Sequence, residues 1–235
     1  MRKCPWFLCL LLALISCDVD YEDNKRLLVT GTVLDENQEP VPNVPVAVFV
    51  SFSAGFGGSG REILGEGRTD TDGTFSLVTL SPLGSLTITA EINERFQAGF
   101  RQQYATLSLI GIETVEEQDA AIRLRDLRLE RLINTSFTLR RLTSTTDTIY
   151  YGLKVSPVEK RRFLAASLAP EVFPIFFSPT DSLFPAQKMA SLDLRGILAK
   201  DTLRLEYRLS SNANAEVISQ KLVYNPETDS YAFEL

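Results

Sequence analysis

The sequence predicts an all-β protein, with two antiparallel β-sandwich domains following a cleaved leader. Three observations support this fold class. Apolar and polar residues alternate over several segments, which is the period of a strand with one buried face. The three-to-four residue spacing of an amphipathic helix is absent between residues 27 and 92. Turn-forming pairs such as Asp72-Gly73 and Asn225-Pro226 separate the alternating segments.

The chain opens with a segment that has the layout of an export leader. Arg2 and Lys3 precede an apolar run that is too short to span a membrane as a mature helix, and the run ends at Ser16 and Cys17. Residues 14–17, Leu-Ile-Ser-Cys, resemble the lipobox of bacterial lipoproteins. This resemblance implies a lipoprotein signal peptide over residues 1–16 and lipid attachment (diacylation and a further acyl chain) at Cys17. The alternatives are an ordinary secretory leader and an uncleaved apolar anchor.

The remaining cysteines, Cys4 and Cys9, lie inside the leader, so the mature chain contains no pair of thiols that could form a disulfide. Two or three acyl chains hold a protein to a bilayer far more firmly than one. We therefore expect a membrane-anchored protein of the cell envelope with a folded body outside the cytoplasm.

Residues 17–26 are expected to form an acidic tether, because residues 18–24 are rich in aspartate and glutamate and poor in apolar side chains. Acidic tracts of this kind resemble surface-display signals in some Gram-negative lineages. An aspartate directly after the lipidated cysteine resembles an inner-membrane retention signal in others. The outer membrane is the favoured location. A surface-display signal and a plain flexible spacer are alternative interpretations of the tract, so the leaflet stays open.

The first domain is expected over residues 27–130. It begins with a strand over 27–34, in which Gly31 occupies a core-facing position, and a turn follows at 35–40. The clearest alternation spans 44–52, where Pro45 suits the start or edge of a strand. After a glycine-rich loop, Asp72-Gly73 is typical of a tight two-residue hairpin, and another strand alternates over 86–92.

Three pieces of this domain together resemble a known family. They are Val29-Thr30-Gly31-Thr32-Val33, the segment 39–46 (Glu-Pro-Val-Pro-Asn-Val-Pro-Val) and the segment 69–77 (Thr-Asp-Thr-Asp-Gly-Thr-Phe-Ser-Leu). Their order and spacing over about residues 27–92 are similar to the carboxypeptidase regulatory-like domain, a transthyretin-like β-sandwich. The resemblance implies about seven strands and a non-catalytic module that serves as a spacer, scaffold or binding domain. The loop at 53–67 is longer than is usual in that family.

The second domain is expected over residues 131–235, where no family is recognised. Strands are predicted over 148–155 and 202–209, and residues 217–224 and 231–235 are read as a closing hairpin around 225–229. The segment 163–185 is apolar and contains four prolines, which exclude a long helix or a central strand. We expect it to be buried over the sandwich end, with an exposed partner surface as the alternative.

Charge and composition exclude several function classes. The formal net charge is −6, with the acidic excess confined to residues before 131, which opposes nucleic-acid binding and supports a boundary near 130. The chain has no histidine, and its single tryptophan lies in the leader, so histidine-based catalytic sites and typical zinc sites are absent. No cofactor, metal or catalytic residue is predicted.

Two short motifs have simpler explanations as turns and loops. Residues 55–60 match G-x-G-x-x-G, but the glycines that follow at 65 and 67 do not suit the helix that a dinucleotide site requires. Residues 70–73 (Asp-Thr-Asp-Gly) resemble part of a calcium loop whose later ligands are missing, so a hairpin turn is preferred.

Three triplets, Asp147-Thr148-Ile149, Asp181-Ser182-Leu183 and Asp201-Thr202-Leu203, resemble O-glycosylation acceptors of some exported Gram-negative proteins. They make Thr148, Ser182 and Thr202 candidate modification sites.

The leading functional hypothesis is a lipid-anchored envelope protein without catalytic activity that binds or scaffolds an envelope protein or a glycan. A fimbrial subunit or pilus-assembly component is the alternative. An enzyme that acts on glycans with carboxylates alone is a third possibility, and paired acids in a lined cleft would be its requirement.

Overall fold

The computed structural model describes residues 19–54, 58–83, 86–112, 121–141, 147–155, 159–164, 180–199, 202–209, 216–223 and 230–234. All regular secondary structure in these ranges is β, which confirms the predicted fold class. The strands are β1 (Tyr21–Asp35), β2 (Pro45–Ala54), β3 (Gly58–Arg68), β4 (Thr74–Pro82), β5 (Ile88–Ile92), β6 (Thr106–Ile112), β7 (Ala121–Arg123), β8 (Leu127–Leu129), β9 (Leu132–Arg140), β10 (Ile149–Lys154), β11 (Glu159–Phe163), β12 (Thr180–Leu183), β13 (Met189–Leu198), β14 (Thr202–Arg208), β15 (Ile218–Val223) and β16 (Ser230–Glu234).

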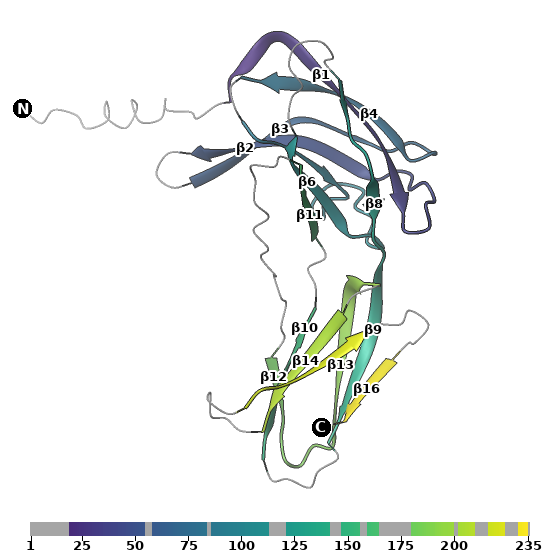
Figure 1. The fold of residues 1–235 in the computed structure, drawn as a ribbon, viewed down its shortest axis with the longest axis vertical. Coiled ribbons are helices and arrows are strands. Elements are labelled where there is room, and N and C mark those ends of the chain that lie inside the picture. The colour runs from purple at the N-terminus through teal and green to yellow at the C-terminus, as the bar shows by residue number, and fades with distance from the viewer. Residues whose placement is uncertain are drawn as a thin grey trace, which may run out of the picture.

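The strands form two sandwiches that lie one above the other in Figure 1. In the first sandwich, a sheet of β4, β1, β7 and β8 packs on a sheet in the order β11-β6-β5-β2-β3. In the second, the sheet β12-β10-β14-β15 packs on β13-β9-β16. Their buried apolar side chains make two separate clusters, as expected when each sandwich has its own core.

The first core follows from the alternation of the sequence. On β2, Val46, Val48 and Val50 are at most 1% exposed and face the opposing sheet. Gly31 on β1 leaves space for its neighbours, because a Cβ there would lie 2.7 Å from Leu127 Cδ1 and 2.8 Å from the Phe75 ring.

The second core is smaller and alternates in the same way. Ile149, Tyr151 and Leu153 of β10 and Leu203 and Leu205 of β14 are almost fully buried. The chain reaches the sheet again at its end, since β16 pairs with β9.

Four expectations about local structure are wrong. Residues 21–26 do not form a tether, because β1 begins at Tyr21, pairs with Pro82 of β4 and is preceded by the buried Val19. The glycine-rich segment is not mainly a loop: from Gly58 onward it is β3, which pairs along β2.

The turn at Asp72-Gly73 does not close a hairpin. Gly73 has the expected positive φ of 74°, but β3 pairs with β2 and β4 pairs with β1, so the turn links two sheets. The predicted closing hairpin of residues 217–224 and 231–235 does not form either. β15 pairs with β14 in one sheet, while β16 pairs with β9 in the other. The turn signals were correct, but sequence alternation does not say which strand will become the neighbour.

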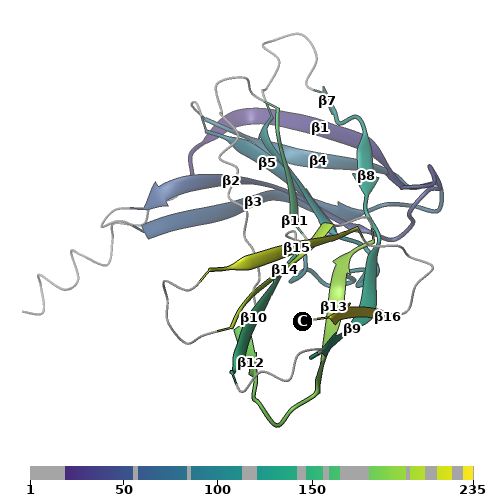
Figure 2. The ribbon, with the colours of Figure 1, turned by 60° about the horizontal axis from the view of Figure 1, so that its bottom comes forward.

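The sheets are mostly antiparallel, with four parallel pairings: β1 with β7, β1 with β8, β6 with β11 and β9 with β16. One of them crosses the predicted boundary at residue 130. The chain leaves β10 of the second sandwich, adds β11 beside β6 of the first, and returns as β12 beside β10 (Figure 2). Of the proline-rich segment 163–185, residues 165–179 lie outside the described residues.

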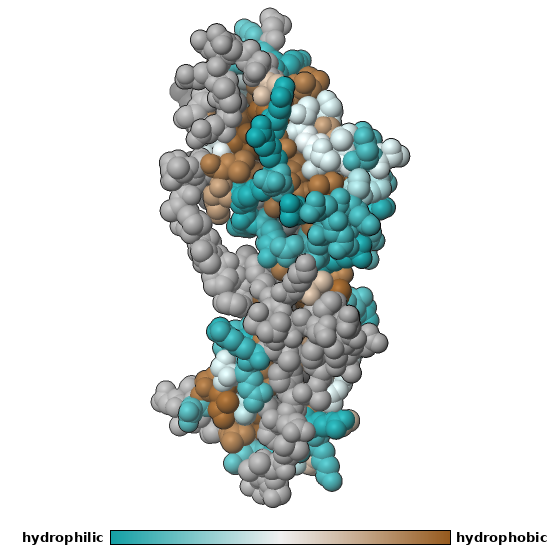
Figure 3. Space-filling view, turned by 45° about the vertical axis from the view of Figure 1, so that its right-hand side comes forward, coloured by the Kyte–Doolittle hydropathy of each residue, from teal (hydrophilic) through white to brown (hydrophobic). Residues whose placement is uncertain are grey.

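The junction between the sandwiches is held by Arg131, between β8 and β9. Its guanidinium is 3.1 Å from a carboxylate oxygen of Asp35, which is 1% exposed, and its amide donates to Glu36. Figure 3 shows hydrophilic side chains gathered on the first sandwich close to this junction.

Candidate functional site

The outer face of the five-stranded sheet carries a row of charged side chains on strands whose other face is core. Phe49 of β2 points to this outer face and is nevertheless only 5% exposed. The Arg61 guanidinium of β3 covers it, with its central carbon 3.6 Å from the ring centroid, as in a cation–π contact. The Phe49 ring therefore supports one face of the Arg61 guanidinium.

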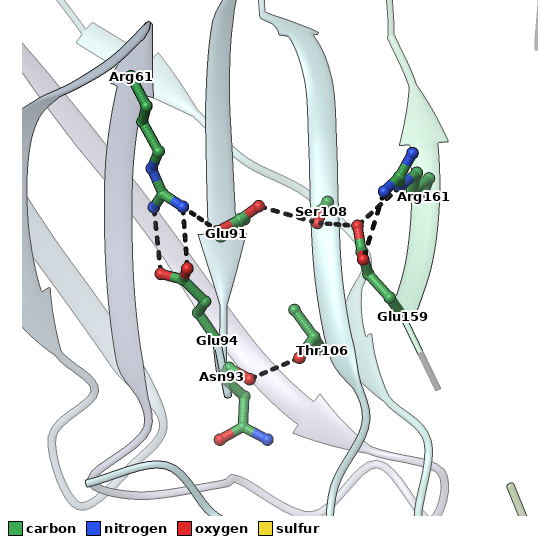
Figure 4. A network of polar contacts seen from close by, with 8 residues as sticks. All are labelled: Arg61, Glu91, Asn93, Glu94, Thr106, Ser108, Glu159 and Arg161. Carbon is green, nitrogen blue, oxygen red and sulfur yellow. Dashed lines mark hydrogen bonds and ion pairs between the residues drawn. The ribbon is translucent and has the colours of Figure 1, made fainter. Parts of the chain in front are cut away.

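Arg61 begins a polar network that crosses β3, β5, β6 and β11 (Figure 4). Its two terminal nitrogens donate to the two oxygens of Glu94 at 2.9 and 3.1 Å, and one of them lies 3.0 Å from Glu91. This fork geometry makes the pair rigid.

The network continues through a serine to the edge strand. The Ser108 hydroxyl is 3.5 Å from Glu91 and 3.3 Å from Glu159, and Arg161 donates to Glu159 at 2.7 Å. The side chains thus connect neighbouring strands above the backbone ladder.

The most buried acid of the network is Glu91, whose side chain is 15% exposed. Burial raises its pKa above the ordinary value; Arg61 opposes the rise, while the charges of Glu94 and Glu159 add to it. Both oxygens of Glu94 and both of Glu159 contact arginines. The network therefore connects β3, β5, β6 and β11 through their side chains, and its outer carboxylates are already paired with cations.

Beside the Arg61–Glu94 pair lies a hollow of about 860 Å³ between β3 and the segment 94–98. Its lining combines apolar groups with charged ones: Pro45, Arg61, Ile63, Glu66, Gly67, Arg68, Glu94, Phe96, Gln97 and Ala98. A mixed lining of this kind is typical of ligand sites, in which apolar surface provides contact area and a few polar groups fix orientation.

Two arginines of β3 bridge to the 94–98 segment at either end of the hollow. Arg61 binds Glu94 at one end, and at the other Arg68 donates to Asn43 at 3.0 Å and to the carbonyl of Ala98. The hollow lies between these two bridges along β3.

The 94–98 segment is also anchored from inside the fold by Asn93, which is fully buried with a positive φ of 61°. Its amide nitrogen donates to the carbonyls of Arg101 and Tyr104 at 3.0 and 2.8 Å, and its oxygen accepts from the Arg101 amide at 2.7 Å. Asparagine suits this role because it tolerates left-handed backbone and can bond on both sides.

Two large apolar side chains of the hollow face solvent. Ile63 is 50% exposed and Phe96 is 89% exposed. An almost fully exposed phenylalanine next to fixed hydrogen-bonding groups offers a surface that a partner can cover.

The sequence-predicted sites lie elsewhere. Cys17 is outside the described residues. Thr148 precedes β10. Ser182, on the neighbouring β12, pairs with Tyr150 of β10, and Thr202 begins β14 opposite Val223 of β15. Thr148 and Ser182 are half-buried, and the pairing of β10 with β12 brings them near one another in the second sandwich, apart from the hollow. Glycosylation stays a prediction.

The turn at Asp70–Gly73 is stabilised internally, since the Thr74 hydroxyl donates to Asp70 at 2.8 Å. Among the described residues, no group of three or more His, Cys, Asp or Glu side chains could hold a metal ion. The same ranges include no helix long and apolar enough to cross a bilayer.

Sequence reasoning missed the residues of the hollow. Glu91 occupies an outward position of the predicted strand 86–92, but Arg61 and Ser108 lie on strands that were not predicted. The meeting of the three side chains depends on strand order. Phe96 was the available signal for the hollow, because it is the aromatic residue in the polar run that follows the strand 86–92.

No protein-family model matches the chain, and no curated protein matches its sequence. Solved structures give distant matches. A Streptococcal ancillary pilin is 12% identical over 91% of this chain, which spans 63% of the pilin, with a TM-score of 0.37. A C-terminally truncated tip fimbrial protein from Porphyromonas gingivalis is 12% identical over 86% of this chain and 82% of its own, with a TM-score of 0.31.

A third structure, a candidate adhesin from Bacteroides ovatus, is 12% identical over 94% of this chain and 95% of its own, with a TM-score of 0.33. Similarity at this level carries no inference about function, so the assignment below depends on the residues of this chain.

Proposed function

We propose that the protein is a lipid-anchored binding protein of the cell envelope, without catalytic activity, and that its ligand occupies the hollow between β3 and the segment 94–98. The observation that carries the proposal is the exposure of Phe96 and Ile63 in the hollow between the two arginine bridges. The ligand is an envelope component that presents an apolar group flanked by hydrogen-bonding groups.

The leader supports the location. In this proposal the lipobox-like residues 14–17 direct acylation to Cys17, two residues before the buried Val19. With β1 beginning at Tyr21, the acyl chains would be separated from the first sandwich by only a few residues. In this proposal the sandwich is held close to its membrane.

The first sandwich also supports the proposal of a carboxypeptidase regulatory-like module. The three sequence pieces of that resemblance lie on β1, at the start of β2 and on the turn into β4. A module of this kind would supply a rigid frame, and loops such as 94–98 would supply the specificity.

The hollow can be tested in intact cells with a photo-reactive phenylalanine analogue in place of Phe96. Val78, which is 67% exposed on the other sheet of the same sandwich, provides the matched control position. We expect a crosslinked adduct of discrete mass from position 96 and none from position 78. The additional change Ile63→Asp, at a half-exposed site in the hollow, should remove the adduct. Equal adducts from both positions, or none from position 96, would refute the site.

A further inference from the structure

The other sheet of the first sandwich has an ordered polar outer face. Phe75 and Leu77 of β4 and Val29 and Val33 of β1 face the core. The residues that alternate with them, Thr30, Thr32, Thr74 and Ser76, face outward. In the register of β1 with β4, Thr30 pairs with Ser76 and Thr32 with Thr74. Two neighbouring pairs of hydroxyl side chains therefore lie across the two strands.

Three arginines lie beside these hydroxyl pairs, on the far side of β1. Arg123 on β7 is level with Thr30, and Arg128 on β8 is level with Leu34, so about 13 Å of β1 separates the two levels. Arg125 lies in the short connection between them. All three side chains are exposed, and with Thr30, Thr32 and Thr74 they line a hollow of about 610 Å³.

Among the residues that the structure describes, no acid pairs with these three arginines, in contrast to Arg61 and Arg161 of the opposite sheet. Arg61 and Arg161 are paired with carboxylates. The guanidinium groups of Arg123, Arg125 and Arg128 form no hydrogen bond or ion pair with any described residue. Of the described residues that line this hollow, Asp126 alone is acidic.

The connection between β7 and β8, which carries Arg125, is fixed by hydrogen bonds from the other sheet. Arg162 of β11 donates to the carbonyls of Arg125 and Asp126 at 2.7 and 3.0 Å, and Asp126 has a positive φ of 56°. The three cations are thus presented by a fixed backbone, which lowers the entropy that a ligand would have to overcome.

We propose that this face binds a linear acidic polysaccharide, whose carboxylates contact Arg123, Arg125 and Arg128 and whose hydroxyl groups contact the Thr and Ser pairs. Guanidinium groups bind planar carboxylates through two parallel hydrogen bonds. Cations distributed along an edge match a polymer with repeated charges better than a single small anion. Asp70, which accepts from the Thr74 hydroxyl, adds a negative charge at that end of the face, so the carboxylates of the ligand belong on the arginine side and its hydroxyl groups on the threonine side.

Attraction to polyanions cannot come from the molecule as a whole, since the chain has a net charge of −6. Binding must therefore depend on the local cluster and must weaken as salt screens it.

The test measures binding of the full-length chain in detergent to polygalacturonate, with neutral dextran, inorganic phosphate and single-stranded DNA as comparison probes. We expect polygalacturonate to bind, dextran not to bind, and millimolar phosphate not to compete. The combined changes Arg123→Gln, Arg125→Gln and Arg128→Gln should raise the dissociation constant by about tenfold or more, which corresponds to the loss of about one charge-assisted hydrogen bond.

The matched control combines Arg140→Gln, Lys188→Gln and Arg195→Gln, which removes the same charge from three exposed cations of the second sandwich. It should leave binding within about twofold. The proposal is overturned if polygalacturonate does not bind, if the control variant loses as much affinity, if phosphate displaces the polymer, or if DNA binds more tightly. The single change Arg125→Gln repeats the test should the triple variant unfold.

Discussion

At the scale of single residues, Asp35 is the buried charge on which the junction between the sandwiches depends. It accepts hydrogen bonds from the amides of Asn37 and Glu39 at 2.8 and 3.1 Å and pairs with Arg131. Burial alone would raise the pKa of Asp35, but these bonds outweigh it and lower the pKa below 3.8. The ionised form is therefore the one that stabilises the fold.

We predict that Asp35→Asn lowers the free energy of unfolding by about 1–3 kcal/mol at pH 7, because a buried charge-assisted network is lost. The stabilisation from Asp35 is complete above its unfolded pKa and disappears as pH falls through the lower folded pKa. Urea denaturation should thus show the difference from the wild type shrinking below about pH 3.8. Asp23→Asn, at an exposed position of β1, is the control, and an equal effect there would contradict the account.

Tyr151, in the second core, makes the stability of the protein depend on pH in the alkaline range. Tyr151 is 2% exposed, and burial together with the nearby Asp181 raises its pKa to about 12. Because the unfolded chain loses this proton near pH 10 and the folded chain does not, stability falls as pH rises from about 10 to 12.

Tyr151→Phe should reduce that alkaline loss by about 1.4 kcal/mol at pH 11, which is one pH unit above the unfolded pKa. Denaturation curves at pH 8, 10 and 11 for both proteins would measure it. The idea fails if the wild type and the variant lose stability in parallel over this range.

At the scale of elements, β11 stands apart from the other strands of its sheet. None of its five side chains is buried, and it pairs in parallel at the edge beside β6. Three contacts connect its described side chains to the first sandwich: Glu159 with the Ser108 hydroxyl at 3.3 Å, Lys160 with Glu130 at 3.3 Å, and Arg162 with the carbonyls of Arg125 and Asp126.

We predict that backbone amides of β11 exchange hydrogen much faster than those of β2, because β11 lacks core contacts and β2 is central and buried. Arg162→Gln should increase exchange in β11 further, whereas Arg140→Gln should not. Exchange followed by mass spectrometry would decide this, and equal protection of β2 and β11 would disprove it.

The elements also show how much the sequence could predict. Strands with one apolar face, such as β2, β5, β10 and β14, were predictable because burial imposes a period of two. β3 was missed because glycines carry no side chain to show a pattern, and β11 because Glu-Lys-Arg-Arg-Phe has no alternation.

The candidate site was less predictable than the strands. Arg61 and Glu94 are 33 residues apart, and the chain places them together only through the pairing of β3 with β2 and of β2 with β5. Strand order of this kind depends on packing between sheets and leaves little trace in local sequence.

At the scale of the whole molecule, two separate cores predict two unfolding steps rather than one. Leu109→Ala in the first core and Leu153→Ala in the second remove fully buried side chains, each at a cost of about 2–5 kcal/mol. Each change should lower the midpoint of one calorimetric transition and leave the other nearly unchanged. A single transition that responds equally to both would mean that β11 and Arg131 couple the sandwiches into one cooperative unit.

The account as a whole requires the two sandwiches to be displayed from a membrane through Cys17. Metabolic labelling with an alkyne fatty acid, followed by membrane fractionation, tests this requirement most directly. We predict that the wild-type chain is labelled and sediments with membranes, and that Cys17→Ser is unlabelled and released while its strand content by circular dichroism is unchanged. An unlabelled wild-type chain, or a Cys17→Ser variant that keeps the label, would contradict the account.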